Sequence, residues 1–364
     1  MRAKTILYAV LMFWAILGLL AASLGTRAAE PPEPPVLVEP TDDETEGGEL
    51  SSTAVSQALN NSVWLPLVAR SVAAPPATPT PPSASGPGRV FSTSVAPATG
   101  EAMKGSKFQI WVPDGVPIIR GIYIYGPGCG ASSLGTGGKD NWAQKWGLAR
   151  LGMEFPNTSC PDWIDPKKGS GRALLTALQT FAQQSGHPEL ADAPFVLWGV
   201  SGGGIWTMNM VVTYPERIAA AFPRAGGWST TVNRAALGIP VMLSSGEKDG
   251  FRPEPTLTLY RAEGAVWSIA VEPNNGHCIC GSKPLSFIFF DAVLGQRLPP
   301  SPPASGPVTL RQVDQSRAWL GDVTTKEIAP AAQYQGDKLK AAWLPDEYTA
   351  RKWQEFVKTG KVTP

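Results

Sequence analysis

Apolar and polar positions alternate along residues 89–300 in two periods, which predict strands and helices in turn. Short runs rich in β-branched and aromatic residues are typical of buried strands. The runs that predict strands are "KFQIWVP" (107–113), "PIIRGIYIYGPG" (117–128), "MEFPN" (153–157), "APFVLWGV" (193–200), "IAAAFPRAGG" (218–227), "PVMLSSGEKDG" (240–250) and "AVWSIAVEP" (265–273). The segments between them that predict helices are 140–152, 170–186, 202–217, 255–264 and 284–296.

The helix at 170–186 has the clearest amphipathic pattern. It begins at Ser170, ends near Gly186 and places four apolar side chains on one face, Leu174, Leu175, Leu178 and Phe181. Strands that alternate with such helices predict a mostly parallel, twisted sheet with helices on both faces. A functional site is then expected at the carboxyl ends of the strands.

Composition divides the chain into four parts. An uncharged apolar run at 6–24 follows Arg2 and Lys4. A cleaved signal has an apolar core of roughly 7–15 residues and a membrane span needs roughly 20, so residues 1–29 are a signal peptide or a signal anchor that tethers the protein to a membrane. In both cases the remaining chain is expected to be exported.

Residues 30–88 are dominated by Pro, Thr, Ser and Gly, which predicts a disordered stalk. The globular pattern occupies 89–300. A Pro-rich hinge and a C-terminal appendage occupy 301–364, with a last helix expected from Asp346 to Lys358.

Charge and cysteine content narrow the function classes. Thirty-one Lys and Arg residues balance 30 Asp and Glu residues and form no basic block, so nucleic-acid binding is not indicated.

The chain has four cysteines, which allow three disulfide pairings, and export would permit disulfides to form. A Cys278–Cys280 bridge would close a small strained ring, so bridges between distant segments are expected, with the pairing left open. C-x-C with two scattered cysteines is not a standard zinc spacing, and no metal or cofactor is expected.

The stretch "LWGVSGGGIW" contains the pattern G-x-S-x-G at 199–203. It follows a predicted strand and opens a predicted helix, which is the context of a nucleophile elbow. The sharp turn exposes Ser201, and the flanking glycines avoid clashes between closely approaching chains. The alternative is a Gly-rich turn that binds phosphate, but neither dinucleotide nor P-loop patterns are present.

A serine hydroxyl needs a base, and the chain has two histidines. His277 follows the last predicted strand, so it is expected at the same edge as Ser201 and is the candidate base. His187 precedes the nucleophile strand and is expected at the opposite edge, as a loop or surface residue. The orienting acid is expected to be Asp249, after the strand at 240–246, because the order Ser, Asp, His is that of this motif. Glu247 is the rival acid.

The oxyanion of an acyl transfer needs two N–H donors. Gly202 follows the nucleophile and is one candidate. The loop "GPGCGASS" after the strand at 121–125 supplies the other. Pro127 has no N–H, so Gly128 and Cys129 are the possible donors, and Cys129 is favoured by its position. Cys129 could also form a bridge to Cys160.

These motifs resemble those of an α/β-hydrolase of the secreted esterase group, which includes polyhydroxybutyrate depolymerase-like and feruloyl or acetylxylan esterase-like proteins. The resemblance covers roughly 91–297 and rests on "GVSGG", "YPERIAAAFPRAGG", "SSGEKDG" and "NNGHC". It differs at Pro127, where the family often has His, and at Val200. It implies that 89–300 is an α/β-hydrolase catalytic domain with a mostly parallel, twisted, eight-stranded sheet. It also implies that the domain hydrolyses esters through an acyl-enzyme without metal.

The predicted function is therefore that of an exported serine hydrolase of small-molecule or polymeric carboxylic esters. The chain from the sixth strand to Asp249 is too short for a large lid, and Trp163 and Trp228 are candidate substrate contacts. The alternatives are a serine peptidase of the prolyl-oligopeptidase type and a tethered, non-catalytic binding protein with the same fold. Residues 30–88 are too short for the propeller domain of such a peptidase.

Overall fold

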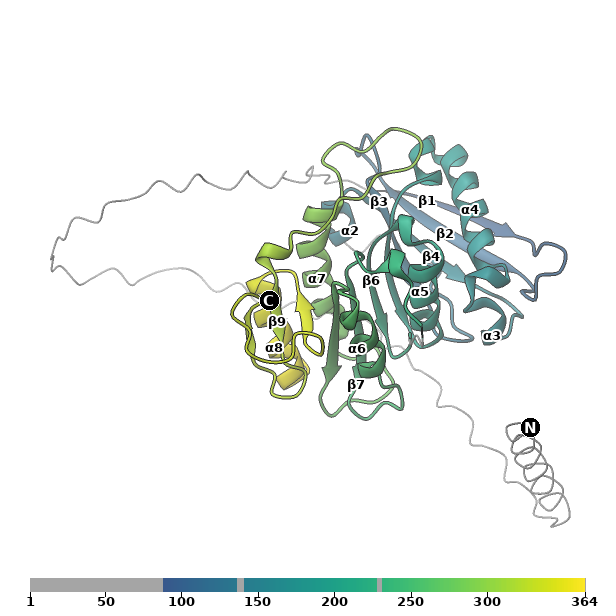
Figure 1. Cartoon of the computed structure of the whole chain (residues 1–364). Helices are drawn as coiled ribbons and strands as arrows, with labels where there is room; N and C mark the ends of the chain where they lie inside the picture. The colour runs from purple at the N-terminus through teal and green to yellow at the C-terminus, as the bar shows by residue number, and fades with distance from the viewer. Residues whose placement is uncertain (1–87, 136–140, 228–230, 364) are drawn as a thin grey trace, which may run out of the picture. The chain divides into compact units, whose positions relative to one another are not determined.

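The computed structural model describes residues 88–135, 141–227 and 231–363. Eight strands form one sheet in the order β1-β2-β4-β3-β5-β6-β7-β8 (Figure 1). They are β1 (Gly88–Val95), β2 (Ser106–Pro113), β3 (Gly121–Gly126), β4 (Leu148–Glu154), β5 (Phe195–Val200), β6 (Ile218–Arg224), β7 (Val241–Gly246) and β8 (Trp267–Glu272). Strand β2 is antiparallel to β1 and β4, and all pairs from β4 to β8 are parallel. The predicted mostly parallel eight-stranded sheet of the α/β-hydrolase fold is thus confirmed.

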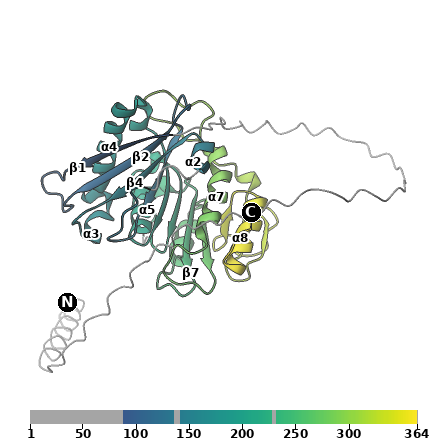
Figure 2. The ribbon, with the colours of Figure 1, turned by 180° about the vertical axis from the view of Figure 1, so that it is seen from behind.

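Helices cover both faces of this sheet (Figures 1 and 2). They are α2 (Asn141–Lys145), α3 (Cys160–Trp163), α4 (Ser170–Ser185), α5 (Gly202–Thr213), α6 (Glu254–Ala262) and α7 (Ser282–Arg297). On one face, Trp206 of α5 donates to Ser170 at the start of α4. On the other, the ring of Tyr123 in β3 lies 5.4 Å from Trp142 of α2 and 6.3 Å from Phe290 of α7. The sheet is therefore buried on both sides, as its continuous apolar strands require.

The helix α4 follows the predicted amphipathic pattern. It begins at Ser170 and ends at Ser185, and the next residue, Gly186, has a left-handed conformation that suits glycine. Leu174, Leu178 and Phe181 are buried against the core, whereas Leu175 is only partly buried.

The helix expected at 140–152 is wrong over its second half. Helix α2 ends at Lys145, and Gly147 has a φ of 66°, which breaks the helix. Residues from Leu148 onward then form β4, between β2 and β3. Because β4 is buried on both faces, its apolar run shows no alternation and cannot be told from a buried helix by periodicity alone.

Two features escaped the sequence pattern at the ends of the described chain. Strand β1 mixes exposed and half-buried positions at the sheet edge. A small sheet of three-residue strands, β9 (Trp319–Gly321), β10 (Ile328–Pro330) and β11 (Ala342–Leu344), precedes α8 (Glu347–Thr359). Such short strands carry too few residues for a periodic signal.

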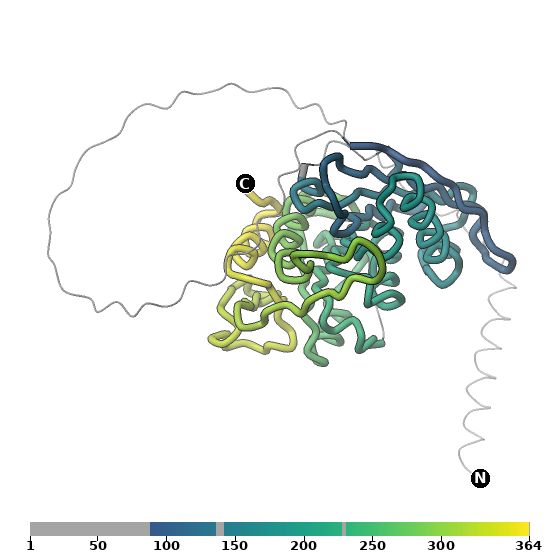
Figure 3. Tube along the Cα trace, turned by 90° about the horizontal axis from the view of Figure 1, so that it is seen from above, coloured from purple at the N-terminus to yellow at the C-terminus, as the bar shows by residue number. Residues whose placement is uncertain are grey.

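This C-terminal segment packs beside β8 (Figure 3). Trp353 of α8 donates from its indole nitrogen to the carbonyl of Ile269 in β8, at 2.6 Å. Arg261 of α6 donates to the carbonyls of Lys338 and Ala341. Helix α8 is capped by Asp346, whose side chain accepts from Thr349 N–H, so the helix begins where the sequence predicts.

Candidate active site

Ser201 lies in the sharp turn between β5 and α5. Its φ of 56° and ψ of −120° are rarely adopted by a residue with a side chain, and its N–H is held by the carbonyl of Arg224 at 2.9 Å. A β-carbon on Gly199 would lie 2.2 Å from the carbonyl oxygen of Gly203. The glycines therefore permit the close approach that lifts Ser201 above the sheet edge, and strain of this kind is typical of functional sites.

The loop after β3 lies beside the serine. A β-carbon built on Gly128 would lie 3.8 Å from Cβ of Ser201, and one on Gly202 would lie 3.2 Å from the backbone nitrogen of Cys129. Within the described part of the chain, no hydrogen bond uses the N–H of Cys129 or Gly202. Two free backbone donors next to the hydroxyl are the arrangement that an oxyanion requires.

A disulfide between Cys129 and Cys160 anchors this loop, with the two Cα atoms 5.3 Å apart. It joins the loop after β3 to helix α3, which follows β4. A β-carbon on Gly202 would lie 2.4 Å from the sulfur of Cys129 and 2.9 Å from that of Cys160. The disulfide therefore packs directly against the start of α5 and supports the position of the Cys129 N–H.

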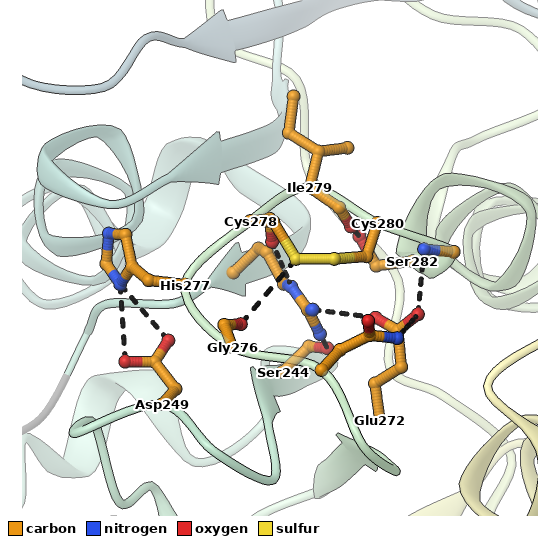
Figure 4. The surroundings of a disulfide bond; sticks show 12 residues. Ser244, Asp249, Glu272, Gly276, His277, Cys278, Ile279, Cys280 and Ser282 are labelled. Carbon is orange, nitrogen blue, oxygen red and sulfur yellow. Dashed lines mark hydrogen bonds and ion pairs between the residues drawn. A yellow bond between two sulfur atoms is a disulfide. The ribbon is translucent and has the colours of Figure 1, made fainter. Parts of the chain in front are cut away.

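His277 and Asp249 form a pair at the same edge of the sheet (Figure 4). The Nδ1 atom of His277 lies 3.2 Å from each carboxylate oxygen of Asp249, and the other ring nitrogen points away from Asp249. The Asp249 side chain is only 4% exposed, whereas that of His277 is 48% exposed. A buried carboxylate thus orients an accessible imidazole, which is the geometry of a general base and its orienting acid.

Hydrogen bonds link the segments that carry this pair and the serine. Lys248 N–H donates to the carbonyl of Asn275, which ties the turn after β7 to the loop after β8. Arg224, whose carbonyl holds Ser201, donates from Nε to the carbonyl of Cys278 at 2.9 Å. Among the described residues no hydrogen bond joins Ser201 to His277, and catalytic hydrogen bonds commonly tighten when substrate binds.

The rival residues lie elsewhere or have another role. His187 precedes β5 and its Nδ1 pairs with Glu189 at 2.8 Å, at the amino-terminal edge of the sheet. The side chain of Glu247 is in the turn after β7 but accepts from the N–H of Asn274 at 2.8 Å. It serves as a turn residue there, while Asp249 is the carboxylate that contacts His277.

Trp163 is 2% exposed and stacks on Phe155 with the ring centroids 4.7 Å apart. Trp163 lines a cavity of about 370 Å³. The other lining residues are 130–132, which follow Cys129, and 154–159, at the end of β4 and in the loop after it. The ring of Trp163 is therefore part of a cavity wall rather than an open stacking face. Trp228, the second candidate contact, lies outside the described residues.

The second disulfide contradicts the expectation of bridges between distant segments. Cys278 pairs with Cys280, whose Cα atom is 5.3 Å away. A positive φ of 48° at Cys280 turns the chain back on itself, so the two side chains meet across a single intervening residue. Chain spacing alone cannot show such a local turn. The bridge immediately follows His277 and restricts the loop that carries it (Figure 4).

Two charged residues near the site escaped the sequence reasoning. Arg224 and Glu272 end strands β6 and β8, and their side chains form an ion pair with Nη2 to Oε2 at 2.7 Å. A signal was available, since each is a single charge at the carboxyl end of an otherwise uncharged strand. Burial lowers the pKa of Arg224, and the nearby carboxylates of Glu272 and Asp249 oppose that shift.

No group of three or more His, Cys, Asp or Glu side chains among the described residues could hold a metal ion. None of the helices in the described ranges is long and apolar enough to cross a membrane. The apolar run at 6–24 lies outside those ranges.

The sequence matches no known family model and no curated protein. Among solved structures, the feruloyl esterase module from Clostridium thermocellum is 12% identical, covering 61% of this chain and 92% of that chain, with a TM-score of 0.38. A thermostable esterase is 13% identical and covers 51% of this chain and 55% of its own, with a TM-score of 0.38. A candidate dipeptidyl aminopeptidase IV from Bacteroides ovatus is 11% identical and covers 58% of this chain and 36% of that chain, with a TM-score of 0.41. At this level of similarity, the function has to be argued from the residues of the site.

Proposed function

We propose that the protein is an exported serine hydrolase that cleaves carboxylic esters. The observation that carries this proposal is the joint position of the strained Ser201 and the His277–Asp249 pair at the carboxyl edge of one mostly parallel sheet. The two disulfides support export, because disulfides persist mainly in oxidising compartments.

In the proposed reaction, Oγ of Ser201 attacks the ester carbonyl carbon while His277 takes the hydroxyl proton. The charge on the carbonyl oxygen is stabilised by the N–H groups of Cys129 and Gly202. Asp249 holds the imidazole in one tautomer and stabilises its charged form. The carbon–oxygen bond to the alcohol then breaks, and His277 returns the proton to the departing alkoxide.

The second half of the reaction releases the acid. The acyl group is now bound to Ser201, and His277 takes a proton from a water molecule that attacks the acyl carbon. Collapse of this second tetrahedral intermediate breaks the bond to Oγ, which recovers its proton from His277. Both halves use the same oxyanion donors, so the site needs no rearrangement between them.

Part of the substrate is proposed to occupy the cavity that Trp163 lines. Its lining residues follow Cys129 and flank Cys160 along the chain, and they combine the Phe155–Trp163 stack with Ser132, Glu154, Thr158 and Ser159. A mixed wall of this kind suits an ester with both apolar and hydroxyl groups. Contact with Trp228 remains a prediction.

Covalent labelling tests the nucleophile. A fluorophosphonate probe is expected to label the native protein and to leave the Ser201→Ala variant unlabelled, because the probe reacts only with an activated serine. Equal labelling of both forms would refute the assignment. A panel of p-nitrophenyl esters and peptide p-nitroanilides then separates ester hydrolysis from peptidase activity, and turnover of the esters alone is expected.

A further inference from the structure

The Arg224–Glu272 pair is enclosed by protein beside the proposed site. The exposed fractions of the two side chains are 0% and 1%. Nη1 of Arg224 also donates to the hydroxyl of Ser244 at 2.9 Å. Removing two charges from water is costly, and such a pair is weak evidence for stability by itself. Its position therefore calls for a functional explanation.

The pair holds the loop of His277 at points on both sides of the histidine. Arg224 binds the carbonyl of Cys278, the residue after His277. Oε1 of Glu272 accepts from the side-chain amide of Asn275 and from the N–H of Gly281, both at 2.9 Å. The loop is thus fixed at 275, 278 and 281 by one ion pair.

The same arginine connects this loop to the nucleophile. Its carbonyl accepts from the N–H of Ser201 at 2.9 Å, while its guanidinium holds Cys278. A single residue at the end of β6 therefore sets the positions of both the serine turn and the histidine loop, which come from opposite sides of it in the sheet.

Glu272 also balances the charge of Arg224. Burial lowers the pKa of Arg224, and the nearby carboxylates of Glu272 and Asp249 oppose that shift. Without Glu272, the interior would hold a cation without its paired carboxylate, beside the loop that carries His277.

The C-terminal segment closes over this pair. A β-carbon on Gly281 would lie 2.3 Å from the carbonyl oxygen of Gly360 and 3.0 Å from Oε1 of Glu272. The end of α8 therefore packs on the residue to which Glu272 is bonded, and it helps to keep water from the pair.

We propose that Arg224 and Glu272 are positioning residues that hold His277 in reach of Ser201. This inference rests on the proposed function, because it assigns these residues a role in the reaction of Ser201. A displacement of about 1 Å in a catalytic group can lower the rate about a hundredfold without contact between the altered residue and the substrate.

The test compares Glu272→Gln and the double variant Arg224→Met/Glu272→Gln with a matched control. Both variants avoid leaving an unpaired carboxylate in the interior. The control is Arg297→Met, because Arg297, the last residue of α7, is a buried arginine that contacts the opposite end of β6. It donates to the carbonyls of Ile218 and Ala219, which begin β6.

Thermal melting, kcat and KM on a p-nitrophenyl ester, and the rate of fluorophosphonate labelling are measured for each protein. The double variant is expected to lose about tenfold to a hundredfold in kcat and in labelling rate, with KM within about twofold. Glu272→Gln is expected to show a smaller loss of the same kind. Arg297→Met is expected to melt at lower temperature with kcat within about twofold of the native value.

The outcomes separate the two proposals. If Ser201→Ala abolishes labelling but the folded Glu272→Gln and double variants retain native kcat, the positioning role is wrong and the proposed function stands. An equal loss of kcat in Arg297→Met also overturns it, since general loosening would then explain the effect. If the double variant does not fold, Glu272→Gln alone decides. Labelling that does not depend on Ser201 overturns both proposals.

Discussion

The chain contains two histidines, and each is paired through Nδ1 with a carboxylate. The two pairs differ in their position in the sheet, in the distance between imidazole and carboxylate, and in their exposure. His277 lies 3.2 Å from Asp249 at the carboxyl edge of the sheet, and its side chain is 48% exposed. His187 lies 2.8 Å from Glu189 at the amino-terminal edge, and its side chain is 15% exposed. The shorter and more buried pair is the one far from the serine turn.

The comparison shows that an imidazole–carboxylate pair is not evidence of catalysis by itself. Glu189 also accepts from the N–H of Ile119 at 2.7 Å, so its carboxylate joins the segments that precede β3 and β5. Asp249 accepts from the N–H of Phe251 in its own turn and otherwise faces His277. The His187–Glu189 pair therefore joins two segments of the chain. The His277–Asp249 pair leaves one ring nitrogen available at the edge of the sheet where Ser201 lies.

The largest expected difference between the two pairs is in catalysis. His277→Ala is expected to lower kcat/KM for a p-nitrophenyl ester at least about 10⁴-fold, because the hydroxyl of Ser201 then has no base. His187→Ala is expected to stay within about threefold of the native protein. Comparable losses in the two variants would remove the distinction between the pairs.

The carboxylates are expected to differ in the same direction. Asp249→Asn should lower kcat about 10³-fold to 10⁴-fold, because an amide favours the wrong imidazole tautomer. Glu189→Gln, the matched change in the other pair, is expected to leave kcat within about twofold, since the amide oxygen can still accept from Ile119. Steady-state kinetics on the same ester measure both, and an unimpaired Asp249→Asn enzyme would argue against Asp249 as the orienting acid.

The smallest expected effect is on the free energy of unfolding. Here the His187–Glu189 pair is expected to contribute more than the His277–Asp249 pair. Glu189→Ala should lower the free energy of unfolding by about 1–3 kcal/mol, because it leaves the buried N–H of Ile119 without its acceptor. His277→Ala should change it by less than about 0.5 kcal/mol, since that side chain is half exposed. Urea denaturation checks this, and a larger loss in His277→Ala would contradict the assignment of roles.

Much of the fold could be predicted because its signals are local. The spacing of apolar residues predicts helix α4. The strands β5, β6, β7 and β8 are short apolar runs that end in polar turns. The first part of strand β4 has the sequence pattern of a helix, because burial on both faces removes the alternation that marks a strand. The strands β9, β10 and β11 are too short to carry a pattern.

The site divides in a similar way. The turn at Ser201 could be predicted because backbones that approach closely need glycine, and the glycines at 199 and 203 are visible in the sequence. His277 and Asp249 could be ordered along the chain because parallel strands bring their carboxyl ends to one edge. The bridge between Cys278 and Cys280 could not be expected from spacing, since a single left-handed residue makes it possible.

The amino-acid sequence by itself determined the alternation of strands and helices, the serine turn and the order of the three proposed catalytic residues, because each depends on a short run of neighbours. Only the tertiary structure decided which histidine and which carboxylate meet, where Trp163 points, and that Arg224 and Glu272 form one buried pair beside them. Such pairings depend on distances across the sheet between residues tens of positions apart, and no local pattern encodes those distances.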